Sequence, residues 1–214
     1  MTRRTAMASL AAGSLLTRAS AQNPPAPGEA AQPKFGYSAP PRTRPMLCVL
    51  SRNLSRVPYA QLGEIARDIG FEGVDLTVMI GGHVDPRITN VDLVRAFESV
   101  RGADLEVPMI TTSITSPSDP TVYPVLYLTG HSQVTLFRMG NWPFESSMDL
   151  RQRMLQMRRD VIQVVSLAQR CGISAMLSNR AGAFLGAATW DNNAIVGDLD
   201  PRWVGHMYDP AEAA

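Results

Sequence analysis

The stretch GFEGVDLTVMIGGHV, residues 70–84, contains the pattern that decides the fold. Its centre, residues 71–80, is a strand-like run rich in apolar and β-branched residues, and a Gly-Gly-His turn follows at once. Every second residue from Val74 is apolar, whereas Asp75 and Thr77 lie on the opposite face of the predicted strand. A strand covered by helices is apolar on its outer face, so Asp75 and Thr77 are predicted to face the inside of a barrel or a cleft.

The same alternation of short strand-like runs and longer helical runs continues along the chain. Strands are predicted at residues 46–52, 71–80, 106–114, 134–140, 173–179 and 202–209, and helices at 59–70, 91–103, from 119 onwards, 148–170 and 190–197. Strands that alternate with helices at intervals of about thirty residues predict βαβ units and a parallel sheet. Two architectures fit this order: a doubly wound open sheet, and a (β/α)8 TIM barrel with about six of its eight units. No Gly-x-Gly-x-x-Gly motif follows the first strand, which removes the main support for a dinucleotide-binding sheet.

The composition is that of a globular protein with one core. The chain has 214 residues, of which 45% are hydrophobic and 18% are charged. Its 20 Lys and Arg residues are balanced by 19 Asp and Glu residues, so it lacks the basic excess of a nucleic-acid-binding surface, and we expect no nucleic-acid partner. No window approaches the ~18 uninterrupted apolar residues of a membrane helix, and no membrane span is expected.

Residues 1–21 resemble a bacterial twin-arginine export signal. A twin arginine precedes a weakly apolar run, and Ala19-Ser20-Ala21 has the small-x-small pattern of a cleavage site. This interpretation predicts a periplasmic or secreted protein, whereas the alternative is a basic leader with no export role. Residues 22–45 are rich in Pro and Ala and cannot bury enough apolar area to offset their ordering entropy. We therefore expect a disordered linker there, followed by the folded part at residues 46–214.

Charged residues near strand ends are the candidates for a functional site. Arg138 lies near the end of the strand at 134–140, and we expect it to face the same interior as Asp75. An unpaired charge in an interior costs several kcal/mol, so these two residues must pair with each other or meet a ligand. Both alternatives stay open. His83 follows the strand at 71–80, on the side where both architectures place their sites, although a loop histidine with no function is equally consistent.

Four segments are similar to the xylose isomerase-like TIM-barrel family, which includes sugar and sugar-phosphate isomerases and epimerases and the endonuclease IV group. They are GFEGVDLTVMIGGHV (70–84), LEVPMITTSIT (105–115), LFRMGNW (136–142) and LDPRWVGHMYDP (199–210). The resemblance extends from about residue 46 to residue 210 and implies a TIM barrel rather than an open sheet. It implies an incomplete (β/α)8 barrel with parallel strands, truncated at its C-terminal side, because the last two strand and helix units have no counterpart.

The resemblance also implies a function: metal-dependent proton transfer on a ketose or an aldose, as in sugar (phosphate) isomerases and epimerases. Family members typically hold a divalent Mn, Mg, Co or Zn ion, for which oxygen ligands are suited. Carried over to this chain, Asp209 matches the metal ligand after the sixth strand. His83, Arg138, Asn179 and Trp142 are the expected substrate-binding residues, and no catalytic residue is assigned.

The chain departs from the family pattern at the metal site. Ser178-Asn179-Arg180 stands where close relatives often have Gln-Asn-His, and Pro210-Ala211-Glu212 stands where many have Pro-Gly-His. The His and Glu ligands of the seventh and eighth strands have no counterpart. We therefore expect a bound metal only if the site is completed, an activity impaired by the truncation, and self-association through the open edges of the barrel.

A non-catalytic carbohydrate-binding module is the alternative function. In that role a rim of Trp142, Phe144, His83 and Trp190 would stack on or hydrogen-bond a sugar without turnover. An endonuclease-like activity would need a basic groove and a cluster of zinc ligands, and the sequence shows neither.

Overall fold

The computed structural model describes residues 44–144 and 147–213; the predicted leader (1–21) and nearly all of the predicted linker (22–45) lie outside them. Six parallel strands form one sheet in the order β1-β2-β3-β4-β5-β6. They are β1 Cys48–Leu50, β2 Gly73–Val78, β3 Met109–Thr112, β4 Leu136–Arg138, β5 Ser174–Ser178 and β6 Val204–Met207. Strands that are consecutive in sequence are neighbours in the sheet, as in a TIM barrel, whereas a doubly wound sheet reverses its order at a switch point.

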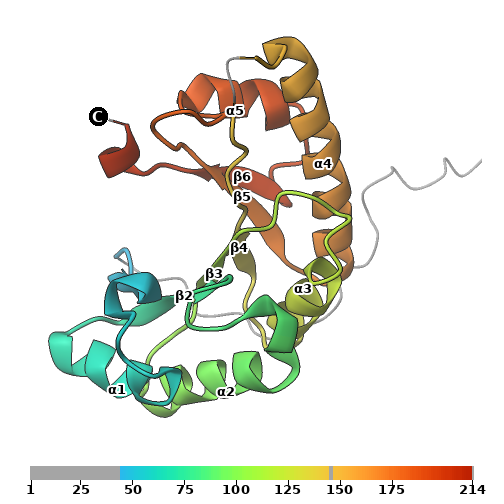
Figure 1. Cartoon of the computed structure of the whole chain (residues 1–214). Helices are drawn as coiled ribbons and strands as arrows, with labels where there is room; N and C mark the ends of the chain where they lie inside the picture. Colours follow the sequence, from blue (N-terminus) through green and yellow to red (C-terminus); the bar gives the residue numbers. More distant parts are fainter. Residues whose placement is uncertain (1–43, 145–146, 214) are drawn as a thin grey trace, which may run out of the picture. The chain divides into compact units, whose positions relative to one another are not determined.

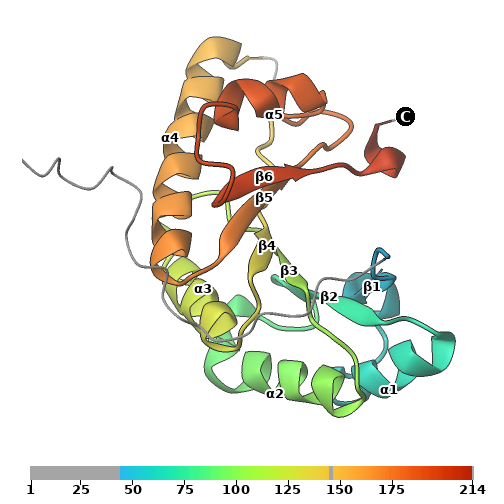
Figure 2. The ribbon, with the colours of Figure 1, turned by 180° about the vertical axis from the view of Figure 1, so that it is seen from behind.

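Helices follow the strands on one side of this sheet. The α-helices are α1 Tyr59–Ile69, α2 Thr89–Gly102, α3 Val122–His131, α4 Leu150–Arg170 and α5 Thr189–Val196. Figures 1 and 2 show that they line the convex side of a curved sheet, while the concave side faces the C-terminal turn η3 (Pro210–Glu212). The prediction of a partial (β/α)8 barrel with six parallel strands is confirmed.

The strands are shorter than predicted, because the predicted runs include parts of the turns beside them. The run at residues 46–52, for example, passes from β1 into the short 3-10 helix η1, Ser51–Leu54. The predicted helices are all present within the described residues, and their bounds differ from the prediction by a few residues.

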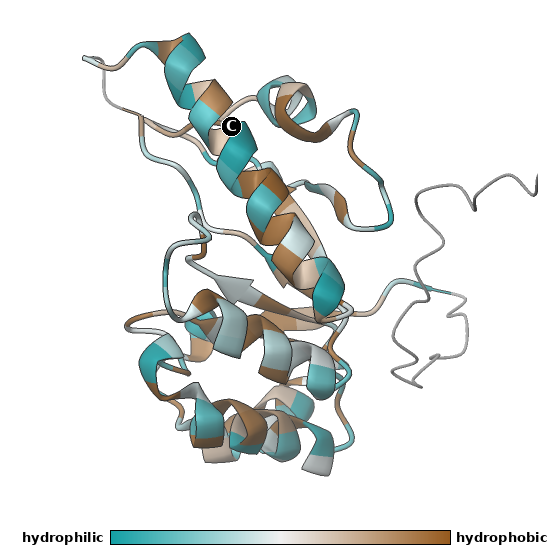
Figure 3. Cartoon of the chain, turned by 90° about the vertical axis from the view of Figure 1, so that its right-hand side faces the viewer, coloured by the Kyte–Doolittle hydropathy of each residue, from teal (hydrophilic) through white to brown (hydrophobic). Residues whose placement is uncertain are grey.

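The hydrophobic core lies between the outer face of the sheet and the helices. Leu76 of β2, Ile110 of β3 and Phe137 of β4 have outward-facing side chains that are fully buried. The long helix α4 buries one stripe of apolar residues, which consists of Met157, Val161, Val164, Val165 and Ala168. Figure 3 shows apolar and polar residues alternating along α4, as expected for a helix with one face on the core.

The inner face of the sheet carries polar side chains. The strand register pairs Thr77 with Thr111, and Thr111 with Arg138. Side chains of register partners point to the same face, and Asp75 lies two residues before Thr77 on that face. The predicted inward orientation of Asp75 and Thr77 is therefore confirmed, and Arg138 faces the same interior.

The strands β1 and β6 form the two edges of the sheet, since each pairs with one strand among the described residues. Self-association through these edges stays a prediction. Among the helices that the structure describes, none has the length and apolarity needed to cross a membrane.

Candidate functional site

The inner polar side chains gather at the carboxyl ends of the strands, which is where TIM barrels carry their sites. Arg138 is the last residue of β4 and Ser178 is the last residue of β5. Asp209 follows β6 and directly precedes η3. Asp75 lies on β2, one register layer deeper than Arg138. The elements therefore bring together residues that are up to 134 positions apart (209 − 75) in the sequence.

Arg138 is partly buried and is held at one end only. Its Nε donates a hydrogen bond to Ser178 Oγ at 2.9 Å. Burial lowers the pKa of the Arg138 guanidinium, and the carboxylates of Asp75, Asp209 and Glu212 oppose that effect. No ion pair within 4 Å joins Arg138 to a carboxylate in the described part of the chain. Asp75 and Arg138 were expected either to pair with each other or to meet a ligand. The ion pair between them is therefore not formed.

Asp75 has one bonded and one unbonded carboxylate oxygen. Its Oδ2 accepts a hydrogen bond from Thr111 Oγ1 at 2.8 Å, whereas its buried Oδ1 has no hydrogen-bond partner among the described residues. Burial raises the pKa of Asp75 to about 6, although the Thr111 hydrogen bond and the Arg138 charge both act to lower it. A carboxyl group that titrates near neutral pH can both accept and donate a proton.

Asn179 fixes the position of Asp209. Its Nδ2 donates to the Asp209 carbonyl oxygen at 2.8 Å, and its Oδ1 accepts from the Asp209 backbone N–H at 2.8 Å. Asn179 is 2% exposed, and each of its polar atoms makes one of these two bonds. The structure thus shows Asn179 bonded to the backbone after β6, and its role in binding substrate oxygens stays a prediction.

Arg180 and Glu212 form an ion pair at the rim that the sequence analysis did not predict. Arg180 Nη1 lies 2.5 Å from Glu212 Oε1, and the Ala181 N–H donates to Glu212 Oε2 at 3.1 Å. The Arg180 guanidinium also covers the ring of Phe184, 5.4 Å from its centroid. These contacts join the loop after β5 to η3. Opposite charges directly after two neighbouring strands were the available signal, but both were interpreted only as departures from a family pattern.

His83 lies in a surface loop, whereas Trp142 lies in the hydrophobic core. His83 Nε2 donates a hydrogen bond to the Val57 carbonyl oxygen at 3.1 Å, so this bond ties the loop after β2 to the segment before α1. Trp142 is 4% exposed and packs in the core, where its Nε1 is buried without a partner among the described residues. The expectation of a rim position for Trp142 is wrong, because a buried ring cannot offer a stacking face. Trp190, by contrast, is 77% exposed.

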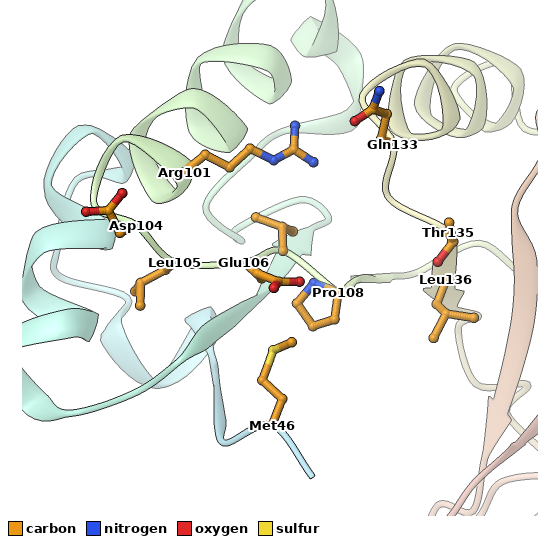
Figure 4. Close-up of a pocket in the computed structure, with 10 residues that line it drawn as sticks. Met46, Arg101, Asp104, Leu105, Glu106, Pro108, Gln133, Thr135 and Leu136 are labelled. Atoms are coloured by element: carbon orange, nitrogen blue, oxygen red, sulfur yellow. The ribbon is translucent and has the colours of Figure 1, made fainter. Parts of the chain in front are cut away.

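A separate hollow of about 620 Å³ opens at the opposite, amino ends of β3 and β4. Figure 4 shows that Arg101, Asp104 and Glu106 come from the end of α2 and the loop after it, and that Leu136 comes from β4. Neither Asp75 nor Arg138 lines this hollow. We therefore place the candidate site at the carboxyl ends, where the inward polar side chains meet.

No protein-family model and no curated protein match the chain. Solved structures do match it. D-psicose 3-epimerase with D-tagatose, from Clostridium cellulolyticum H10, has a TM-score of 0.60 at 15% identity, over 73% of this chain and 59% of that chain. L-ribulose 3-epimerase has a TM-score of 0.62 at 13% identity, over 79% of this chain and 62% of that chain.

A xylose isomerase-like TIM-barrel protein from Mycobacterium smegmatis, in complex with magnesium, matches with a TM-score of 0.58 at 15% identity, over 78% of this chain and 64% of that chain. The chain has the fold of the xylose isomerase-like TIM barrels. The resemblance predicted from the four segments is thus confirmed at the level of the fold. The alignments cover between 59% and 64% of these three larger barrels.

The side chains at the carboxyl ends of the strands do not fit a metal centre. Within residues 44–144 and 147–213, no three His, Cys, Asp or Glu side chains are grouped so that they could hold a metal ion. Asp209 uses its Oδ1 to accept a hydrogen bond from the Ala211 N–H at 3.0 Å. A divalent metal takes several protein ligands, so Asp209 alone cannot fix one. Its role as a metal ligand stays a prediction, and no chemical step is assigned to a metal.

Proposed function

We propose that the chain binds a small polyhydroxy carbonyl compound, a ketose or an aldose, at the carboxyl ends of β2 to β6, as a protein of the sugar isomerase and epimerase type. The described functions of two structural neighbours, a D-psicose 3-epimerase and an L-ribulose 3-epimerase, support this class of ligand. The observation on which the proposal depends is the arrangement of Asp75 and Arg138. They carry opposite charges and face one interior, and they are not bonded to each other.

A sugar would satisfy the Arg138 guanidinium. Arg138 is fixed through Nε by Ser178, and its two terminal amino groups bond to no described residue, so the carbonyl and hydroxyl oxygens of a sugar can accept hydrogen bonds from them. Asp75 lies one register layer deeper and its Oδ1 is buried, so it acts on the site through its charge. A hydrogen bond to a charged group contributes about 1.5–3 kcal/mol.

Carbohydrate binding without turnover is the second candidate function. One observation favours it, namely that the described residues do not group three metal-ligating side chains together. The two candidates share the same ligand and the same residues. They differ in whether protons of the bound sugar exchange with the solvent.

Calorimetry on the full chain tests the proposal. D-fructose, D-psicose, D-tagatose and D-glucose would be titrated with and without Mn²⁺, using the wild type and Arg138→Met. Because a hydrogen bond to a charged group contributes about 1.5–3 kcal/mol, we expect Arg138→Met to weaken sugar binding by about 10- to 100-fold. Circular dichroism would verify that each variant is folded.

Arg101→Met is the matched control, because Arg101 lines the hollow at the other end of the strands. We expect it to bind the sugar as the wild type does. Loss of binding in Arg101→Met with full binding in Arg138→Met would contradict the proposed site, and so would the absence of binding by every sugar. Sugar binding without Mn²⁺ and without proton exchange would favour the binding module over the enzyme.

A further inference from the structure

We propose that residues 33–43 of this chain dock into the hollow at the amino ends of β3 and β4, so that the folded part begins near residue 33. The composition of residues 22–45 predicts a disordered linker there, and residues 33–43 lie outside the described residues. The hollow has a volume of about 620 Å³ and is lined by neither Asp75 nor Arg138. This docking is therefore independent of the proposed sugar site.

The chain enters the folded part beside this hollow. Both carboxylate oxygens of Glu72 accept hydrogen bonds from the Arg44 guanidinium, at 2.5 and 3.0 Å, and the Leu47 N–H donates to one of these oxygens at 3.0 Å. Met46 lies between Arg44 and Leu47 in the sequence, and it lines the hollow. In Figure 4 its side chain points toward the other lining residues. The segment that ends at residue 43 therefore starts at the opening of the hollow.

The hollow combines an apolar lining with acidic side chains. The apolar lining residues are Met46, Leu105, Val107, Pro108 and Leu136. Asp104 and Glu106, from the loop after α2, contribute two carboxylates (Figure 4). Arg101 also lines the hollow, but its Nη2 donates to the Ser132 carbonyl oxygen at 2.6 Å, and its guanidinium lies 5.7 Å from the centroid of the Phe97 ring. An occupant with apolar and positively charged side chains is complementary to this lining.

Residues 33–43 have this composition, whereas residues 22–32 do not. The aromatic residues of the segment are Phe35 and Tyr37, and its basic residues are Lys34 and Arg42. Residues 22–32 contain no aromatic and no basic residue. The two aromatic residues are two positions apart, so in an extended backbone both rings point to the same face. The rings can therefore contact the apolar lining together, while the basic residues on either side of them meet the carboxylates at its edge.

The covalent connection favours this segment over a second copy of the chain as the occupant. Eleven residues in an extended backbone span up to about 36 Å, so the segment can cross the hollow from its attachment at Arg44. A short tether holds it at an effective concentration in the millimolar range, which a second copy does not reach in dilute solution. Pro33, Pro40 and Pro41 restrict the backbone before docking, so less conformational entropy is lost.

Limited trypsin digestion of the full chain, followed by mass spectrometry, tests the docking. Trypsin reaches the bond after Arg42 when the segment has left the hollow, so the cleavage rate follows the population of the open form. We expect this bond to be cleaved at least about 10-fold more slowly in the wild type than in a synthetic peptide of residues 30–47. Phe35→Ser combined with Tyr37→Ser should raise the rate in the full chain by about 10-fold or more, because the burial of both rings is lost.

Variants on the hollow itself show whether the segment docks there. Asp104→Asn removes one carboxylate of the lining and should raise the cleavage rate after Arg42 by about 2- to 5-fold. Asp68→Asn, on the exposed surface of α1, is the matched control and should be cleaved as the wild type is. In NMR of the methyl-labelled full chain, we expect nuclear Overhauser effects between the rings of the segment and the methyl groups of Met46, Leu105 or Leu136.

Three results would overturn the docking. The first is cleavage after Arg42 that is as fast in the wild type as in the peptide. The second is protection that increases with protein concentration, which would identify a second copy as the occupant. The third is the absence of Overhauser effects between the segment and the hollow, with equal cleavage of Asp104→Asn and the wild type. None of these measurements requires a sugar, so their outcome leaves the proposed function unaffected.

Discussion

Asp75→Asn is expected to stabilise the folded chain at neutral pH, by up to about 3 kcal/mol near pH 7.5. The carboxyl has a pKa of about 6 in the folded chain against an ordinary value of 3.8, so the folded state binds the proton more tightly than the unfolded state. This contribution is fully present below about pH 4 and is lost as the pH rises through about 6. Asparagine stays neutral throughout and keeps an oxygen that can accept from Thr111.

Urea unfolding of the wild type and Asp75→Asn, near pH 4 and near pH 7.5, measures this difference. The variant should be more stable only at the higher pH. Asp68→Asn on the exposed surface of α1 is the control, with an expected change within about 0.5 kcal/mol at both pH values. A variant that is less stable than the wild type near pH 7.5 would show that the ionised carboxylate stabilises the fold.

Phe137→Ala is expected to lower the free energy of unfolding by about 3–5 kcal/mol. Phe137 lies in β4, between β3 and β5, and its side chain is 0% exposed on the outer face of the sheet. The substitution removes a large apolar side chain from the core. It leaves a cavity, because the strands on both sides and the helices behind prevent the neighbouring side chains from filling the space.

Trp190→Ala is the matched control for Phe137→Ala. Both changes delete an aromatic side chain, but Trp190 is 77% exposed, so its loss should change stability by less than about 0.5 kcal/mol. Urea unfolding followed by circular dichroism measures both variants. A loss below about 1 kcal/mol in Phe137→Ala would contradict the placement of this ring in the core.

A charge that destabilises the fold has a functional implication. Burial of Asp75 is the largest influence on its pKa, and neither Thr111 nor Arg138 compensates for it. Functional sites commonly retain groups that cost stability, because the same lack of partners makes them reactive toward a ligand. The stability gain expected for Asp75→Asn therefore measures what this buried carboxylate costs the fold.

The sequence was sufficient to predict the parallel sheet and its inward face. Alternation along β2 placed Asp75 and Thr77 inside, and the βαβ order predicted parallel strands. These features follow from local periodicity, which a single sequence contains. Arg138 could be assigned to the same interior for the same reason. Periodicity left the barrel and the open sheet as alternatives, and the barrel was predicted from the resemblance of four segments.

The contacts within the site could not be predicted, because they depend on register between strands. Thr111 bonds Asp75 only because β3 pairs with β2 in one particular register. Asn179 was interpreted as a substrate ligand because its amide could not be known to bond the backbone of Asp209. Trp142 carries a polar N–H and follows a strand end, features that rim and core residues share, so its burial was not visible from its position.

The central claim is that Asp75 and Arg138 face a single ligand, and NMR of the isotopically labelled full chain tests it most directly. A ketose that binds in calorimetry would be titrated while the carboxyl carbons of aspartate and the Nε of arginine are observed. We predict that the signals of Asp75 and Arg138 shift together and saturate at the same sugar concentration. Shifts at Arg101 and Asp104, with Asp75 and Arg138 unchanged, would place the ligand at the other end of the strands and contradict the account.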